Sequence, residues 1–379
     1  MATLATENHG LKLRNPFIIG SGPPGTNMRV IEKAFDLGWG GVIAKTISLE
    51  ADKVHNVQPR YAKLKSDDGQ VIGWENIELI SDRPFETWLE EFEASKNSHP
   101  DGVLIASIME EHNKDAWQEI VERCQDAGVD AFELNFSCPH GLPERKMGAA
   151  MGENPDIVEE VSRWVMEVAK VPVWAKMTPN VTRIEDPTRA AFRAGCQGVS
   201  AINTIRSIMR VNLDTLRPEP TVEGYTVPGG YSSVAVRPIA LRMVKEIATV
   251  IRSEYPDRVI SGLGGIETGE DAAQFILLGA DNVQVCTGVM KHGYKMIGGL
   301  CDELLGFMER HGFETLDDFK GHSLDYFTTH ANLVERQAER RAADKAAVEA
   351  KKSVVTNDAE WTTEDFVTQS DALAGEEKA

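Results

Sequence analysis

The 379-residue sequence has few cysteines and no long apolar run. Its five cysteines include no Cys-x-x-Cys pair, which argues against a structural zinc site, an iron–sulfur cluster and a secreted disulfide framework. No stretch approaches the ~18–20 apolar residues of a membrane span, and no basic region followed by an apolar run marks a signal peptide. The sequence therefore predicts a cytoplasmic protein without a metal site and without membrane contact.

Positive charge is also scarce. The chain has 40 Lys and Arg residues against 59 Asp and Glu residues, which gives a formal net charge of −19. Such a surface repels nucleic acid and the anionic leaflet of a membrane. A chain of this length buries about three quarters of the surface that it exposes when unfolded, so its core needs no disulfide or metal. We expect neither nucleic acid nor lipid as a partner.

Short runs rich in Val, Ile and Ala alternate with longer helical patterns over the first 310 residues or so. The short runs are apolar on both faces, as buried parallel strands are, and a helical pattern follows each of them. Eight such units predict an α/β protein, a (β/α)8 TIM barrel, as one catalytic domain over 1–325. The predicted strands are 16–20, 41–45, 102–108, 131–136, 171–177, 198–202, 258–263 and 282–287.

Two excursions, at about 46–82 and 204–236, interrupt the repeat after strand ends, where barrel enzymes build their sites. Residues 326–379 differ from the barrel: from about 331 the sequence is rich in Ala and charged on every face, which predicts a helix, and a polar tail follows. We predict a second domain over 326–379 that is available for docking a partner.

The segment Gly20–Gly25 (GSGPPG) matches the Gly-x-Gly-x-x-Gly pattern of dinucleotide-binding folds. That reading requires backbone N–H groups around the phosphates and an acidic residue about 20 positions later. Pro23 and Pro24 remove two of the donors, and the next strand ends in Lys45 instead of an acid. A tight turn at the barrel mouth is the better interpretation.

Polar residues and glycines recur at the predicted C-terminal ends of the strands, which meet at one rim in a barrel. Glycines after the seventh and eighth strands suit a phosphate site, two lysines can stabilise an anionic reduced ring, and amide side chains match a cyclic imide. Asn76 and Glu78 lie in WENIELISD, which by itself is an ordinary helix-start pattern. The strand-end residues are Lys45, Thr46, Asn135, Ser137, Lys176, Asn203, Thr204, Gly264, Gly265 and Thr287.

Cys138 lies in Ser-Cys-Pro-His-Gly, a Pro/Gly loop just after a strand end. A lone cysteine is most often a small core residue, but a thiol in such a loop can act as a nucleophile or a proton donor. The absence of a paired acid favours the role of proton donor.

Several motifs resemble the flavin-binding pyrimidine domain of the dihydropyrimidine dehydrogenase family, and especially its bacterial NAD-dependent catalytic subunits. They are Asn135–Gly141 (NFSCPHG), Asn76–Ser81 (NIELIS), Ala175–Asn180 (AKMTPN) and Val236–Leu241 (VRPIAL). The resemblance covers about residues 8–310. Class 1 dihydroorotate dehydrogenases share the barrel and an active-site Cys loop, but NIELIS points to the pyrimidine enzymes.

This resemblance implies an FMN-dependent oxidoreductase that reduces the C5–C6 double bond of uracil, thymine or a close heterocyclic analogue. Hydride would pass from flavin N5 to C6, and Cys138 would protonate C5 as the general acid. The implied substrate contacts are Asn76, Glu78, Asn135, Ser137, Asn203 and Thr204. The implied FMN contacts are Ser21, Gly22, Lys45, Thr46, Lys176, Ser233, Gly264, Gly265, Cys286 and Thr287.

The sequence departs from the family at two places. Ser233 stands where the family has a flavin-contacting glycine. The cysteine-rich segment that carries iron–sulfur clusters in the family is missing, so we expect NAD(P)H to act only indirectly. Its electrons would come through a partner subunit with clusters or a second flavin, in a homodimer or hetero-oligomer.

Two other functions stay open at this point. A dihydroorotate dehydrogenase-like enzyme would need a partner for the substrate carboxylate, which Glu78 would repel. A non-catalytic flavin subunit of an electron-transfer complex is the other alternative, although the Asn and Cys residues speak against it.

Overall fold

The structure is a computed structural model in which residues 2–137 and 148–355 are described. It divides into two compact units, Met1–Asp325 and Tyr326–Ala379. The first unit is the barrel. In the second, the described residues form the helix α11 (His330–Val355).

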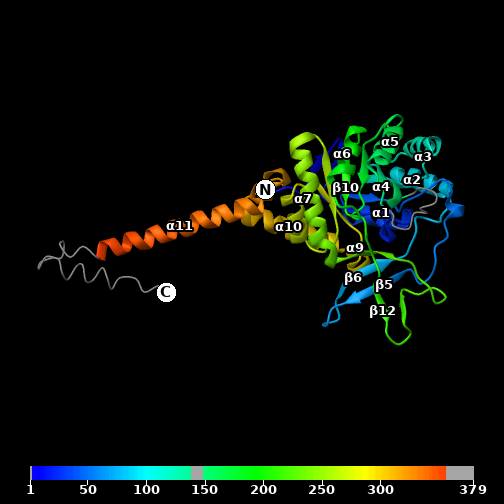
Figure 1. Ribbon diagram of the computed structural model, residues 1–379. Helices are drawn as coiled ribbons and strands as arrows, with labels where there is room; N and C mark the ends of the chain where they lie inside the picture. Colours follow the sequence, from blue (N-terminus) through cyan, green and yellow to red (C-terminus); the bar gives the residue numbers. More distant parts are fainter. Residues whose placement is uncertain (1, 138–147, 356–379) are drawn as a thin grey trace, which may run out of the picture. The chain divides into compact units, whose positions relative to one another are not determined.

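Eight parallel strands close into a barrel in the order of the sequence, which confirms the predicted (β/α)8 fold (Figure 1). Each predicted strand is present, one to three residues shorter than expected. The strands are β3 (Phe17–Ile19), β4 (Gly41–Ile43), β7 (Val103–Ile108), β8 (Ala131–Asn135), β9 (Val173–Lys176), β10 (Gly198–Ala201), β15 (Val259–Leu263) and β16 (Asn282–Val285).

Helices follow the strands and form the outer layer of the barrel. Local signals set several of their starts: the side chain of Asn154 accepts from the amide of Asp156 ahead of Pro155, and Thr268 and Asp271 form a capping box. The helices are α1 (Met28–Asp36), α2 (Phe85–Ser98), α3 (Lys114–Asp126), α4 (Ala149–Gly152), α5 (Pro155–Met166), α6 (Glu185–Arg193), α7 (Arg237–Glu254), α8 (Gly269–Leu277), α9 (Thr287–His292) and α10 (Met296–His311).

Two apolar layers hold the first unit together. The larger one lies between strands and helices and extends from Leu4 to Phe319. The smaller one fills the N-terminal end of the barrel, where Leu11 and Leu13 of the hairpin β1 (Thr6–Asn8) and β2 (Leu11–Leu13) pack with inward-facing strand residues such as Ile43. The barrel interior at this end is thus filled with side chains.

The two excursions fold into a sheet of their own, which the sequence analysis did not predict. Its order is β11-β14-β6-β5, so it joins β5 (Tyr61–Lys65) and β6 (Val71–Asn76) of the first excursion to β11 (Ile205–Ser207) and β14 (Gly229–Ser232) of the second. The hairpin of β12 (Arg210–Asn212) and β13 (Arg217–Glu219) extends from it (Figure 1). We call this four-stranded sheet the accessory sheet.

The expected helix start at Asn76 and Glu78 is wrong. Asn76 is the last residue of β6, where it pairs with Gly230 of β14, and α2 begins only at Phe85. The pairing between residues that are far apart in sequence overrides the local helix-start pattern. Similarly, Thr287 does not end the eighth strand but begins the short helix α9, which Gly293 ends with a φ of 77°.

Candidate functional site

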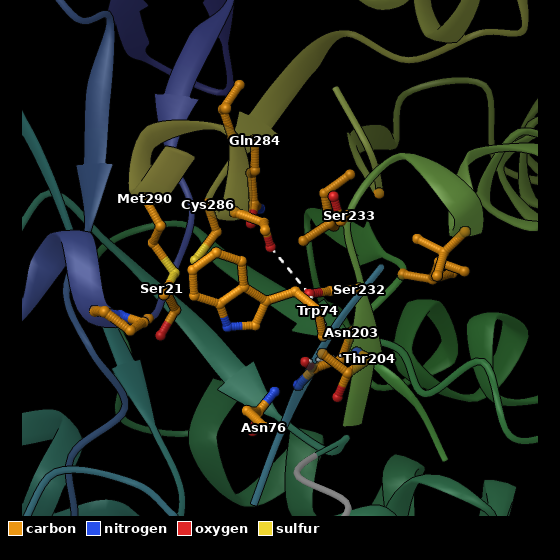
Figure 2. A pocket seen from close by; sticks show the side chains of 18 of the residues that line it. Ser21, Trp74, Asn76, Asn203, Thr204, Ser232, Ser233, Gln284, Cys286 and Met290 are labelled. Carbon is orange, nitrogen blue, oxygen red and sulfur yellow. Dashed lines mark hydrogen bonds between the residues drawn. The ribbon is translucent and has the colours of Figure 1, made fainter. Parts of the chain in front are cut away.

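A deep pocket opens at the C-terminal end of the barrel, between the strand ends and the accessory sheet (Figure 2). The space between its walls, which includes open solvent at the mouth, is about 1110 Å³. Its lining includes the following predicted residues: Ser21, Gly22, Lys45, Thr46, Asn76, Glu78, Asn135, Lys176, Asn203, Thr204, Ser233, Gly264, Gly265, Cys286 and Thr287.

Two predicted residues are not in this lining. Ser137 is fully buried beside it, and its Oγ accepts a hydrogen bond of 2.8 Å from Asn203 Nδ2. Cys138, the predicted general acid, lies outside the described residues, as do residues 139–147. The structure thus brings together the described candidates from seven strand ends and the accessory sheet, and leaves their individual roles as predictions.

Glu78 is surrounded by cations and a phenol. Its carboxylate contacts Lys45 Nζ at 3.2 Å and Arg60 Nη1 at 2.8 Å, and it accepts a hydrogen bond of 2.8 Å from the Tyr61 hydroxyl. Burial, reinforced by this carboxylate, raises the pKa of Tyr61 well above its ordinary value, so the phenol stays a donor. The negative charge of Glu78 is therefore compensated, and the argument that it repels a substrate carboxylate is weaker than the sequence implied.

Lys176 belongs to a polar network inside the barrel. Its Nζ donates to Glu133 Oε1 at 2.9 Å, and Gln284 Nε2 donates to the other carboxylate oxygen at 2.8 Å. Glu133 is inaccessible to solvent and Lys176 is 3% exposed. The network fixes the lysine at the floor of the pocket and balances its charge.

Amide and hydroxyl side chains form a connected group on one wall. Asn135 Nδ2 donates to Thr46 Oγ1 at 2.9 Å, while its Oδ1 accepts from the amide and the hydroxyl of Ser137, both at 3.1 Å. Asn203 Oδ1 accepts from the amide of Thr204 at 2.8 Å. Each side chain is held in place by its neighbours, so the group presents its remaining donors and acceptors in a fixed pattern.

Asn76 reaches the same wall from the accessory sheet. Its Nδ2 donates to the carbonyl of Gly230 at 3.1 Å, and a Cβ added at Gly230 would come within 2.1 Å of Thr204 Oγ1. The absence of a side chain at Gly230 is what lets the accessory sheet approach the strand end that carries Asn203 and Thr204.

Glycines and small hydroxyl residues form the other end of the pocket. Gly264 and Gly265 have φ values of 133° and 77°, conformations that favour glycine. A Cβ at Gly265 would come within 2.8 Å of the Ser233 carbonyl oxygen, so the two loops are in close contact. The hydroxyls of Ser232 and Thr287 lie 3.0 Å apart, joining the accessory sheet to α9. This end has the composition of the barrel phosphate site after the seventh and eighth strands.

Trp74, Glu133 and Gln284 are site residues that the sequence analysis did not identify. Trp74 lines the pocket from β6, and in Figure 2 its indole lies among Ser21, Cys286 and Asn76. Glu133 and Gln284 interrupt strands that are otherwise apolar (AFELNF and NVQVC). A polar residue that faces inward in such a strand is the signal that could have identified them.

Other features bear on the chemistry of the site. Burial raises the pKa of the Cys286 thiol to about 11, so it is a thiol and not a thiolate at neutral pH.

The described residues hold no cluster of His, Cys, Asp or Glu suited to a metal ion. Over residues 2–137 and 148–355, no helix combines the length and apolarity that crossing a bilayer requires.

The sequence model of the dihydroorotate dehydrogenase family matches residues 3–308. The chain is 56% identical over 376 residues to the chloroplastic dihydropyrimidine dehydrogenase (NADP(+)) of Arabidopsis thaliana, covering 98% of this chain and 87% of that protein. It is 41% identical over 312 residues to the NAD-dependent dihydropyrimidine dehydrogenase subunit PreA of Escherichia coli, covering 82% and 74%.

A third relative is the catalytic subunit of dihydroorotate dehydrogenase B (NAD(+)) of Pyrococcus abyssi, 33% identical over 315 residues, which are 83% of this chain and 97% of that subunit. The predicted resemblance to the bacterial NAD-dependent subunits is confirmed by the E. coli relative, and the plant protein is more similar to the chain still. The predicted similarity to dihydropyrimidine dehydrogenases is confirmed. The chain belongs to the dihydroorotate dehydrogenase family of oxidoreductases.

Proposed function

We propose that the chain is an FMN-dependent oxidoreductase that reduces the C5–C6 double bond of uracil, thymine or a close heterocyclic analogue. The observation that carries this proposal is that the two ends of the pocket have different chemical groups. Amide side chains and two buried lysines lie at the strand ends β4 to β10, and a glycine and hydroxyl end lies after β15 and β16. The relatives named dihydropyrimidine dehydrogenases support the choice of substrate.

The described residues fit FMN. Gly264 and Gly265 line the end of the pocket where the phosphate would bind, and the hydroxyl of Ser233 is buried without a partner among the described residues. Lys45 and Lys176 supply positive charge for an electron-rich ring, and Thr46 and Ser21 supply hydroxyls beside them. FMN bound here would supply the electron pair, as a hydride, for the reduction.

The chain's own residues orient the substrate and supply a proton. Asn76, Asn135, Asn203 and Thr204 would match the alternating carbonyl and N–H groups of a pyrimidine ring. The three asparagine side chains are held by hydrogen bonds to Gly230, Thr46 and Ser137, respectively. Cys138 follows the strand β8 that carries Asn135 and would donate the proton to C5 of the ring. The accessory sheet adds Trp74 and Asn76 to the wall of the same pocket.

The charges of the pocket favour a neutral pyrimidine over orotate. Lys45 and Lys176 are the cations in its described lining, and each already contacts a carboxylate, Glu78 or Glu133. The substrate carboxylate that a dihydroorotate dehydrogenase must hold would have to compete with these carboxylates for the same lysines.

Cofactor release and anaerobic reoxidation together test the proposal. Heat-denatured protein should release FMN, not FAD. The photoreduced protein should be reoxidised by uracil or thymine with formation of the 5,6-dihydropyrimidine, and not by orotate. Reoxidation by orotate alone would assign a dihydroorotate dehydrogenase-like function. If none of the three compounds reoxidised the protein, the remaining hypothesis would be a non-catalytic flavin subunit of an electron-transfer complex.

We also propose that NAD(P)H reduces this chain through a second protein that carries clusters or another flavin. The E. coli relative is named a subunit of an NAD-dependent enzyme, which supports an assembly of more than one chain. The helix α11, in the unit that follows the barrel, is the segment that we propose for docking.

A further inference from the structure

Ser233 adopts a backbone conformation that a serine seldom adopts. Its φ is 80° and its ψ is −169°, in a region where glycine is favoured because it has no Cβ. The residue connects β14 to the short helix η4 (Val234–Val236), which leads directly into α7. The resemblance described above places a glycine at this position, so this chain keeps the conformation of glycine but adds a side chain.

The hydroxyl of Ser233 has no visible use within the folded chain. Ser233 is 1% exposed and lines the pocket, and its Oγ has no hydrogen-bond partner among the described residues. A buried hydroxyl without a partner is unfavourable, and so is a left-handed serine. Two unfavourable features at one lining residue point to a ligand atom that completes the hydrogen bond.

The surroundings identify the chemistry of that ligand. The Ser233 carbonyl lies against Gly265, and the neighbouring Ser232 contacts Thr287, so Ser233 belongs to the glycine and hydroxyl end of the pocket. The 18-residue helix α7 begins four residues later, at Arg237, and the partial positive charge of a helix N-terminus favours anions. The guanidinium of Arg237, the first residue of α7, is paired with Asp271, so it is engaged within the protein.

We infer that the Ser233 hydroxyl donates a hydrogen bond to the phosphate of the bound mononucleotide. This side-chain contact goes beyond the backbone contact implied by the family's glycine. The inference rests on the proposed function, since it takes FMN as the occupant of the pocket.

The test compares a ligand with the phosphate and one without it. Apoprotein of the full chain is titrated with FMN and with riboflavin, with flavin fluorescence as the readout, for the wild type, Ser233→Ala and Ser233→Gly. Because a hydrogen bond to a charged group is involved, both variants should lose about tenfold or more in affinity for FMN. Their affinity for riboflavin should not change.

Ser95→Ala is the matched control. Ser95 is likewise fully buried with an unpartnered Oγ, but it lies in α2 and not in the pocket lining, so its loss should change neither affinity. Ser233→Gly serves as the second variant in case Ala folds poorly, because glycine suits the φ of 80°.

The outcomes separate this inference from the proposed function. A wild-type protein that binds no FMN refutes the proposed function. Unchanged FMN affinity in Ser233→Ala and Ser233→Gly overturns the inference alone, and so does an equal loss for FMN and riboflavin, which would mean that Ser233 shapes the pocket instead of contacting the phosphate.

Discussion

Glu133 and Lys176 form an ion pair in the interior of the barrel, where neither side chain has appreciable access to water. Removing charges from water is unfavourable, so the pair persists because each charge satisfies the other and Gln284 adds a hydrogen bond. Lys45 likewise contacts Glu78. At the scale of single residues, the site therefore holds its lysines in place by giving each a carboxylate partner.

Loss of one partner should destabilise the protein more than loss of both. We expect Glu133→Gln to lower the free energy of unfolding by about 3–5 kcal/mol, because it leaves the Lys176 charge buried and unpaired. The double variant Glu133→Gln, Lys176→Met should recover most of this loss. Urea unfolding of the apoproteins measures both values, and a double variant that is less stable than Glu133→Gln would contradict the charge-pair account.

Cys138 is predicted to matter for proton transfer only. Cys138→Ala should retain FMN and bind uracil but lose about 10²–10⁴-fold in turnover, the range for a removed general acid. Cys138→Ser should be nearly as slow, because a hydroxyl is a much weaker acid than a thiol. Single-turnover reoxidation by uracil gives the rates.

Cys124→Ala is the control for this prediction. Cys124 lies in the core between strands and helices, and burial raises the pKa of its thiol. Because this thiol is inaccessible to solvent, replacing it should affect stability at most. If Cys138→Ala turned over uracil at the wild-type rate, the proton would have to come from another group.

The accessory sheet is the element that adds a wall to the pocket at the rim of the barrel. It carries Trp74 and Asn76 to the strand ends, and within it β6 is joined to β14 by Glu75, whose carboxylate accepts from the amide of Gly229 at 2.9 Å. The fit at Gly230 is close, since an added Cβ would overlap with Thr204. The position of the sheet thus determines the position of two predicted substrate contacts.

Gly230→Ala should therefore displace Thr204 and Asn76 without reaching the glycine end of the pocket. We expect kcat/KM for uracil to fall by about 10–100-fold, because small displacements of positioning groups have effects of this size, while FMN content stays normal. Steady-state kinetics with an artificial electron donor and the visible spectrum measure the two quantities.

Gly299→Ala provides the comparison. Gly299 lies in α10 with open space where a Cβ would be, so this variant should keep its kinetics and gain roughly 0.5–1 kcal/mol of stability. Equal kinetics for Gly230→Ala and the wild type would mean that the accessory sheet does not set the substrate contacts.

At the scale of the whole molecule, the barrel and the C-terminal unit contribute differently. The main core ends at Phe319, and apart from the half-buried Asn332 every side chain described from Tyr326 to Glu349 is exposed. The match to the plant relative covers 98% of the chain and so extends into this unit, whereas the match to the E. coli subunit covers 82%. The barrel has a core of its own, and we assign the C-terminal unit to the assembly with a partner.

Truncation after Asp325 should leave the barrel intact. We expect the shortened chain to keep its thermal unfolding temperature, its FMN and its uracil reduction with an artificial donor, because it retains the whole core and pocket. When the electron-donating partner is added, NAD(P)H should no longer stimulate uracil reduction by the shortened chain. Rapid NADH oxidation coupled to uracil by the isolated full chain would refute the need for that partner.

The eight strands and most helices were predictable because parallel strands buried on both faces are apolar runs of a fixed length, and the helices between them carry local start signals such as Asn154 before Pro155. The rim residues were predictable for a related reason. In a closed barrel all strands end at one face, so a strand end such as Lys176 or Asn203 can be placed at the site from its position in the sequence alone.

Only the tertiary structure decided the rest, because it depends on contacts between distant segments. The accessory sheet pairs Asn76 with Gly230, 154 positions away, through strands too short to show a pattern. Glu133 becomes a partner of Lys176 only once the barrel closes, and the compensation of Glu78 by Lys45 and Arg60 requires the first excursion to fold back over the rim. The positive φ of Ser233 likewise could not be predicted from the sequence, because a serine seldom adopts it.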